Sequence, residues 1–574
     1  IMKLNKLFAA STLLAERLLT GCSDEKTDGP ANSASEGNVY ASLKLSLPVG
    51  SRSTTIDPDD NTNSNDGYEI GQEYENTVAS VFVVLATQNG SGTFEKVATA
   101  NSDLKTGGDG EHPVYVLTFQ NSELQEVAGK EEEIFVFAYC NASSALQNKI
   151  KTETDFAAPT GDVTTSGEII WGKNAFLMSN RELASIKDGI PADLSDYNTP
   201  ANPFDLGTVD VQRAAVRFDF KQYQEEGREP NTYPIKHEIL DEYMGEVVLE
   251  EMALINQSNT YYLLSRTSAS ANWSDPKLCV RENRNNWVVS TNEDLKNQSN
   301  LGSQIAAINQ AFSFTGRTVE NTNIDFNSKD FEWTKISDIA NNDDDNHYDK
   351  EGNLTWPEDN NIMEGYKIWR YTTENTIPCI SATETGAQKR GITTGIIFKG
   401  YIKSLGDDDD LSDNNEVLYA FNNLLYGNKD ALKAAVDAAP ASGLADAFQA
   451  AFTDGQIDAN GDLLASYYGF TVYRPTNIGT TAKPVYRHYV YYTYWNRHND
   501  NGNNTQMGQM EFATVRNNVY KLAVTAINQF GHPGDPDDDP DPEDPDDPDE
   551  SDKVYFKVSV RVMPWVVRIN NITL

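Results

Sequence analysis

The sequence has few cysteines, a deficit of basic residues and no long apolar run. Only four of its 574 residues are cysteine, so a scaffold built on disulfides is excluded. Lys and Arg number 46 against 86 Asp and Glu, which gives a formal net charge of −40. So acidic a chain is not attracted to nucleic acid or to anionic lipid headgroups. No stretch approaches the roughly 20 apolar residues that a membrane helix needs.

Motifs for catalysis and metal binding are also lacking. There is no paired-histidine zinc motif, no Cys/His metal spacing, no nucleophile elbow, no P-loop and no dinucleotide fingerprint. The acidic loops at 57–66 and 341–349 do not fit the register of a calcium-binding EF-hand loop. We therefore expect no enzyme, no cofactor and no metal site. The six histidines are scattered, at His112, His237, His347, His488, His498 and His532.

The residues that are present favour a mostly β fold. Tyr (27) and Phe (23) are plentiful, and short apolar runs alternate with segments rich in Asn, Asp, Thr and Gly. The length indicates two domains. The sequence also predicts small helical insertions at Gln304–Phe312 and at Lys429–Phe452, the latter broken at Pro440. The clearest strand predictions are Val78–Ala86, Val114–Phe119, Ile134–Cys140, Glu246–Ala253, Ile396–Ile402 and Val485–Trp495.

The aromatic run Tyr486–Trp495 admits two interpretations. It could be a platform on which sugars stack, or a core strand buried on both faces, and we favour the core strand. The cysteines leave a similar choice open. Cys140 ends an apolar strand and is expected to be a buried small side chain, whereas Cys279 and Cys379 could form a bridge or remain free thiols.

The N-terminus is predicted to be a targeting segment. A basic start is followed by the apolar stretch 7–15, and the segment ends at Leu19–Cys22, which resembles the lipobox of bacterial lipoproteins. Glu16 and Arg17 interrupt the apolar stretch and depart from that pattern. We expect residues 1–22 to be a lipoprotein signal peptide, with Cys22 as the lipidated residue.

A strand with one apolar face follows the tether at 23–37. It breaks at Pro48, and Arg52-Ser53 then offers a trypsin-type cleavage site before an Asp- and Asn-rich loop. Residues 23–52 are therefore interpreted as a propeptide that carries a removable strand. The apolar face of that strand comprises Val39, Ala41, Leu43, Leu45 and Leu47.

A second alternating strand stands near the C-terminus, after an acidic spacer. Residues 535–550 are eleven acids and five prolines, which cannot bury a core and should stay extended. A strand beyond such a spacer is typical of one that is delivered elsewhere. We predict that it is a donor strand, which enters the groove that the removable strand leaves. Its predicted contact residues are Val554, Phe556, Val558, Val560, Val562 and Trp565.

These features come together in a family resemblance. The segments 494–501 and 510–522, the spacer, and the segment 560–567 resemble the short-fimbria major subunits of Bacteroidales, the Mfa-type members of the FimA-like (type V) fimbrillins. Glu73–Val78 resembles the opening of that family's N-terminal domain, and Val209–Phe220 the first strand of its C-terminal domain.

The resemblance implies two transthyretin-like β-sandwich domains. It also implies export as an outer-membrane lipoprotein, cleavage at the position of Arg52, and assembly by exchange of the C-terminal strand. The expected division of the chain is a signal peptide at 1–22, a propeptide at 23–52, domains at 53–207 and 208–530, a spacer at 531–552 and the donor strand at 553–574.

The predicted function is that of a shaft subunit of an adhesive cell-surface fimbria. Its expected partners are identical subunits, anchor and tip subunits and an Arg-specific protease, while the host receptor stays open. The rival from another class is a cell-surface lipoprotein that binds glycans, which would have no use for a strand beyond the spacer. A tip or anchor subunit is the third alternative. A cleavage site together with a donor-like strand favours the shaft.

Overall fold

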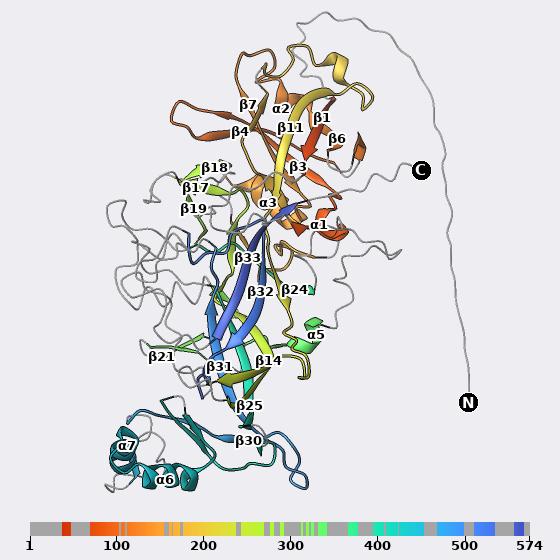
Figure 1. Ribbon diagram of the computed structural model, residues 1–574. Helices are drawn as coiled ribbons and strands as arrows, with labels where there is room; N and C mark the ends of the chain where they lie inside the picture. The colour runs from red at the N-terminus through yellow and green to blue at the C-terminus, as the bar shows by residue number, and fades with distance from the viewer. Residues whose placement is uncertain are drawn as a thin grey trace, which may run out of the picture.

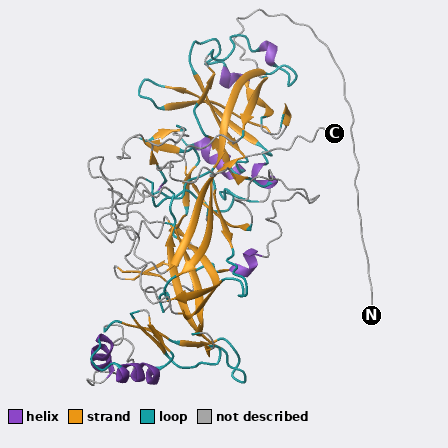
Figure 2. Ribbon diagram, in the orientation of Figure 1, coloured by secondary structure: helices purple, strands orange, loops and turns teal. Residues whose placement is uncertain are grey.

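The computed structural model describes most of residues 37–533, together with residues 556–566. Strands dominate the described residues, and the helices are few and short (Figure 2), so the predicted mostly β fold is confirmed. No helix among these residues is long and apolar enough to cross a bilayer. The longest stretches outside the description within 37–533 are 48–68, 292–311, 341–364, 377–393, 453–467 and 499–509.

The N-terminal half forms one sheet, at the top of Figure 1. Its strand order is β4-β3-β7-β9-β11-β1-β6-β5, with β10 beside β7. β4 and β6 are distant in this order but contact each other, so the sheet curls around one core. The strands are β1 (Asn38–Ser46), β3 (Val81–Gln88), β4 (Phe94–Ser102), β5 (Lys105–Gly108), β6 (Pro113–Gln120), β7 (Ile134–Cys140), β9 (Met178–Asn180), β10 (Ala184–Ile186) and β11 (Phe204–Arg213).

Two sheets pack face to face in the C-terminal half. Their orders are β2-β33-β32-β12-β24 and β13-β14-β25-β31-β30, with β23 beside β14 and β26 beside β25. Both sheets contribute to one apolar core, in which the ring centroids of Phe220 and Phe398 are 6.0 Å apart. This half is therefore a β-sandwich. The strands are β2 (Glu69–Ile70), β12 (Val216–Lys221), β13 (Thr232–Lys236), β14 (Tyr243–Ile255), β23 (Thr334–Lys335), β24 (Tyr366–Thr372), β25 (Gly395–Leu405), β26 (Asp409–Asp410), β30 (Pro475–Asn477), β31 (Tyr486–Trp495), β32 (Asn518–Ile527) and β33 (Phe556–Val566).

The six strands predicted above are all present, as β3, β6, β7, β14, β25 and β31. The alternation in β6 places Tyr115, Leu117 and Phe119 in the core, while the continuous apolar run in β3 is buried on both faces. Period-2 patterning and apolar runs bounded by polar turns were therefore sufficient to locate these elements.

The crossing between the two halves lies later than the boundary expected near Gly207. β11 pairs with β1 and β9 of the N-terminal sheet, and the sandwich begins with β12. The predicted single strand Val209–Phe220 is thus divided at Ala214 and Ala215, both fully buried. Gly207 itself, with φ of +83°, lies at an irregularity in the β1–β11 register. Apolar residues continue across the crossing, so the sequence carries no polar linker to mark it.

A helical insertion occupies the far end of the sandwich, at the bottom of Figure 1. Its helices α6 (Lys429–Ala438) and α7 (Gly443–Phe452) confirm the predicted pair with its break at Pro440. They share a small core with the sheet β28-β27-β29, formed by β27 (Leu418–Phe421), β28 (Leu424–Tyr426) and β29 (Phe470–Tyr473). The other predicted helix, Gln304–Phe312, lies outside the described residues except for Phe312, which begins a short strand.

The aromatic run in β31 belongs to the core on one face. His488, Val490 and Tyr492 are buried, and Val490 and Tyr492 lie in the core of the sandwich. The opposite face is only half-buried, and there the Lys399 ammonium lies 4.7 Å from the ring centroid of Tyr489. The preferred core interpretation is therefore confirmed for one face, and the other face is an amphipathic surface.

Cys140 and Cys279 are buried free thiols in the N-terminal core. Cys379, the other end of the bridge left open above, lies outside the described residues. Burial raises the pKa of both described thiols to about 12, so they are protonated at neutral pH. This agrees with the prediction of a packing role for Cys140.

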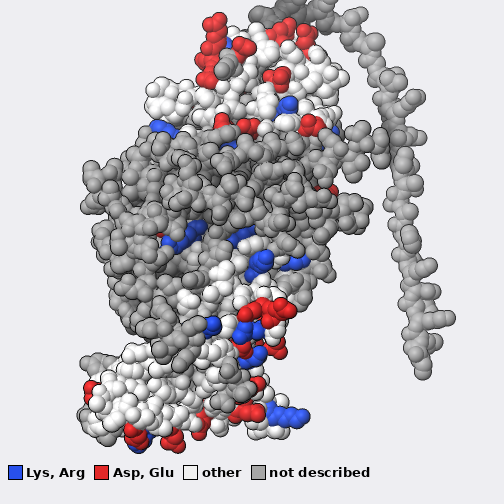
Figure 3. Space-filling model, viewed as in Figure 1, with Lys and Arg blue, Asp and Glu red and all other residues white. Residues whose placement is uncertain are grey.

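Short elements connect the halves and line their surface. β8 pairs with β16 and so ties the N-terminal half to the strand connections of the sandwich. Acidic side chains gather at both ends of the face in Figure 3, as the net charge of −40 leads one to expect. These elements are α1 (Glu73–Asn76), α2 (Asn121–Leu124), α3 (Ser144–Thr152), the 3-10 helix η1 (Ser195–Tyr197), α5 (Ile336–Ala340), β8 (Thr160–Asp162), β15 (Gln257–Ser258), β16 (Thr260–Tyr262), β17 (Arg266–Ser268), β18 (Lys277–Leu278), β19 (Trp287–Val288), β20 (Phe312–Ser313), β21 (Arg317–Glu320) and β22 (Asn323–Phe326).

Candidate strand-exchange site

The apolar face of β1 is fully inside the N-terminal core. Its four alternating apolar residues, and Leu47 just after its end, are each at most 3% exposed, whereas Lys44, on the other face, is exposed. Burying five such side chains contributes about 10 kcal/mol before ordering costs, at about 2 kcal/mol each. The buried face is the one predicted for the removable strand: Val39, Ala41, Leu43, Leu45 and Leu47.

The backbone of β1 is paired on both sides. It runs antiparallel to β6, with pairs from Asn38↔Gln120 to Lys44↔Val114, and parallel to β11. Ser42 Oγ also donates a hydrogen bond to the carbonyl of Phe204, at 3.4 Å. Loss of β1 would therefore leave two strands with unpaired amide and carbonyl groups facing an apolar groove.

β6, one of the two strands beside β1, has an anchor that does not involve β1. Tyr115 of β6 is buried, and its hydroxyl donates to the carbonyl of Val78 at 2.7 Å, so the side chain anchors β6 to the segment before β3. Burial, together with nearby Cys140, raises the pKa of Tyr115 and keeps the hydroxyl a donor. This contact positions β6 without the help of β1.

The C-terminal strand lies on the chain's own sandwich. β33 pairs antiparallel with β32 along its length, from Asn518↔Pro564 to Ile527↔Phe556. On its other side, among the residues that the structure describes, it pairs with β2, in parallel, at Glu69↔Trp565 and Ile70↔Val566. In the single chain, the predicted donor strand therefore pairs with β32 of its own sandwich. The sequence did not predict this position.

The segment that contains β2 is fastened by a buried charged network, which we define as Glu75, Arg217, Asp219 and Lys521. Arg217 Nη1 lies 3.0 Å from Glu75 Oε2, and its Nε lies 2.7 Å from Asp219 Oδ1. Lys521 Nζ is 3.1 Å from Asp219 Oδ2. Burial by itself raises the pKa of Asp219, but Arg217 and Lys521 outweigh it and hold this pKa at about 2. The four charged side chains are at most 1% exposed.

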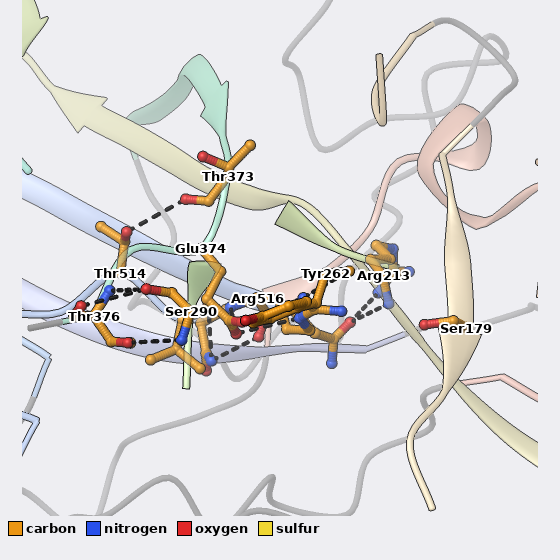
Figure 4. Close-up of polar contacts among 12 residues, drawn as sticks. Ser179, Arg213, Tyr262, Ser290, Thr373, Glu374, Thr376, Thr514 and Arg516 are labelled. Atoms are coloured by element: carbon orange, nitrogen blue, oxygen red, sulfur yellow. Dashed lines mark hydrogen bonds and ion pairs between the residues drawn. The ribbon is translucent and has the colours of Figure 1, made fainter. Parts of the chain in front are cut away.

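Further polar contacts fill the junction between the halves, as Figure 4 shows. Arg516 is buried against Glu374, with Nε 3.2 Å from Oε2, and its Nη2 donates to the carbonyl of Tyr262 at 2.9 Å. Arg213, at the end of β11, donates to Asn517 Oδ1 at 3.1 Å. The contact between Arg213 and Asn517 crosses from the N-terminal half to the C-terminal half, whereas those of Arg516 stabilise the C-terminal half, where removal of one partner of the buried ion pair would be costly.

The residues predicted from the sequence are thus divided among three places. The four apolar residues of β1 and Leu47, which follows it, are brought together in one buried face. Phe556, Val558, Val560, Val562 and Trp565 lie in β33, of which the structure describes the backbone. Cys22, Arg52, Ser53 and Val554 lie outside the described residues.

The charged network was missed at the level of sequence. Its signal is the presence of Arg217 and Asp219 in the segment 214–220, whose other residues are all apolar, because charges buried in a strand require partners. Their partners Glu75 and Lys521 are too distant in the chain for any spacing rule to find.

The protein is thus mostly β. Its strand β1 lies in the middle of a sheet, and its strand β33 follows an acidic spacer. Residues 486–571, which span β31, β32 and β33, match the family model described as "Major fimbrial subunit protein type IV, Fimbrillin, C-terminal". The predicted resemblance to the fimbrillins is thereby confirmed in this C-terminal segment, and it supports a fimbrial subunit.

Solved structures give weaker matches. The tip fimbrial protein Mfa3 from Porphyromonas gingivalis, with a C-terminal truncation, is 11% identical; the alignment covers 92% of this chain and 100% of that chain, with a TM-score of 0.32. A fimbrilin from Porphyromonas gingivalis W83 is 12% identical, with coverage of 92% and 98% and a TM-score of 0.34. Likeness this distant carries no functional weight. No curated protein matches the chain.

Proposed function

We propose that the chain is a structural shaft subunit of an adhesive cell-surface fimbria, which polymerises when the C-terminal strand of one subunit fills the groove vacated by β1 in the next. The observation that carries the proposal is the place of β1. A strand just upstream of a trypsin-type site occupies the middle of a sheet and buries five apolar side chains. One cut separates that strand from the rest of the fold.

Maturation precedes assembly in this proposal. The signal peptide 1–22 directs export, Cys22 takes the lipid of an outer-membrane lipoprotein, and an Arg-specific protease cuts between Arg52 and Ser53. N-terminal sequencing of filaments should read from Ser53, and a start upstream of Val39 would contradict this order of events. Cys22→Ala should leave the precursor unlipidated, and normal partition of that variant into detergent would exclude the lipobox.

The handover requires β33 to leave its own sheet. The sixteen residues of the acidic spacer reach up to about 50 Å when extended, at ~3.1 Å per residue. The single chain does not need this reach, because Phe556, which follows the spacer, pairs with Ile527, eight positions before the first residue of the acidic segment. A linker of this length is consistent with a strand that is transferred between bodies.

The test mixes protease-treated full-length protein with a chain truncated after Asp552. Both sheets of the sandwich other than β33, and the whole N-terminal core, lie upstream of the truncation. The truncated chain should accept a neighbour's strand but offer none, so it should shorten the filaments in proportion to its share of the mixture. Long filaments from the truncated chain alone, seen by negative-stain microscopy, would exclude donation by this segment.

A further inference from the structure

β33 is enclosed at its C-terminal end by a ring of contacts. On one side it pairs with β32, which carries Lys521, and on the other with β2, which leads directly into α1 and Glu75. The buried charged network connects these two neighbours of β33: Glu75 binds Arg217, Arg217 binds Asp219, and Asp219 binds Lys521. β33 cannot leave by this end unless β2 moves aside.

β2 is too short to hold its position alone, since it makes only two pairs with β33. Its hold comes from α1. Gln72 donates its backbone N–H to Glu75 Oε2 at 2.5 Å, and Asn76 Nδ2 donates to the carbonyl of Gly71 at 2.8 Å. Both contacts fold the turn after β2 onto the helix.

α1 is in turn anchored in the protein interior. Tyr371 of β24 and Arg217 of β12 both donate to the carboxylate of Glu75, which is fully buried. Arg213 Nε donates to the Glu75 carbonyl at 3.0 Å, and its Nη2 donates to Asn76 Oδ1. Glu75 is therefore the residue on which the placement of β2 depends.

We propose that β2 and α1 form a clasp on the end of β33, and that Glu75 is the positioning residue that sets how readily this strand leaves its own sheet. The inference rests on the proposed function, because it concerns the same strand handover. The clasp is also connected to the cleavage site. In the uncut chain β2 is covalently continuous with β1 on one side and with α1 on the other; a cut after Arg52 breaks the connection to β1 and leaves the connection to α1.

One cut would then act on both halves of the exchange. It separates β1 from the fold, which allows the groove to open, and it breaks one of the two covalent connections of the clasp on β33. A subunit that has not been cut would hold its own strand and its own groove closed together.

The first test measures amide hydrogen exchange by mass spectrometry in the full chain carrying Arg52→Ala, which keeps it uncut. Glu75→Gln removes the buried charge with little change of shape, and it should accelerate exchange in 556–566 at least tenfold while β1 and β24 change less than twofold. The matched control is Glu73→Gln, on the same helix but exposed. Unchanged exchange in 556–566 would overturn the clasp.

A second variant covers the case in which Glu75→Gln does not fold. Ile70→Pro removes an amide donor from β2 without touching the charged network, and Ile70→Ala is its control. Ile70→Pro should also release 556–566 at least tenfold, and protection equal to that of the control would count against the clasp.

A filament assay distinguishes the clasp from the strand handover of the proposed function. With Arg52 restored and protease added, Glu75→Gln should form filaments several-fold faster than the parent chain, whereas a merely disruptive substitution would slow them. Faster exchange in 556–566 with no filaments from any chain would support the clasp and refute the strand handover. Filaments that grow at the parental rate, with parental exchange, would refute the clasp and leave the handover standing.

Discussion

The two end strands of the chain, β1 and β33, are held in opposite ways. β1 lies between two partners, is paired along most of its length on both sides, and buries its whole apolar face. β33 has one partner along its length and touches a second only at its last two pairs. A strand in the middle of a sheet cannot leave without opening two long ladders, whereas β33 has to open one long ladder and the two pairs with β2. The difference suggests why the N-terminal strand would need a protease and the C-terminal strand only the release of a clasp.

The largest effect is expected from a charge on the predicted contact face of β33. Val560→Asp should abolish filaments, because a groove closed on both sides would bury an unpaired carboxylate at a cost of several kcal/mol. Ser559→Asp adds the same charge on the opposite face of the strand and should still assemble. Equal assembly by both variants in negative-stain images would show that the face of the strand does not matter.

A large effect on β1 should be confined to the uncut protein. Leu43→Ala removes a fully buried side chain and should lower the free energy of unfolding of the N-terminal half by about 2–5 kcal/mol, measured by urea denaturation. In cleaved, assembled protein this residue is no longer present, so the filaments should be as stable as those of the parent. Lys44→Ala is the exposed control. An equal loss in filaments would mean that β1 stays in place after assembly.

Acid should destabilise the sheet that contains β12 and β32 more than the sheet that contains β1, and this effect should be smaller than the preceding ones. The pKa of Asp219 in the folded chain is about 2, below its ordinary value of 3.8, so its contribution is fully present above pH ~4 and is lost as the pH falls toward 2. This difference corresponds to about 2 kcal/mol. Between pH 5 and pH 2.5 the protection factors, which correct for the intrinsic slowing of amide exchange in acid, should therefore fall more in β12 and β32 than in β1, which is held by apolar contacts.

The control for the acid experiment is the same measurement on Asp219→Asn, in which this pH dependence should disappear. Asp205→Asn, at an exposed position of β11, should leave it intact. Equal acid sensitivity of β1 and β32 in the parent chain would contradict the assignment of the effect to the charged network.

The smallest expected effect concerns the thiols in the core that β1 shares. Since burial raises the pKa of Cys140 and Cys279 to about 12, both should resist iodoacetamide at pH 8 in the uncut chain. Peptide mass spectrometry should find them labelled only after unfolding in urea. Rapid labelling of the folded, uncut chain would mean that the core under β1 opens without a cut.

Local pattern predicted the elements well, and long-range pairing accounts for what it missed. The alternation in 39–47 located β1 and its buried face, and the proline break separated α6 from α7. The sequence could not show that β33 returns to β32, because a period-2 strand fits any open edge. Nor could it place the crossing at Ala214 and Ala215, where no polar residue interrupts the run. Glu75 and Arg217 are 142 positions apart, and nothing in either local segment indicates the other.

The double pairing of β1 also has a mechanical meaning. A strand held between β6 and β11 and pulled along its own axis loads both ladders in shear, so many hydrogen bonds must fail together. A strand peeled from an edge loses them one after another. Any strand that takes the place of β1 inherits this geometry, and the spacer that precedes β33 would direct the pull along the strand. A filament built from such joints would resist tension from flowing liquid at every subunit, without a covalent bond between neighbours.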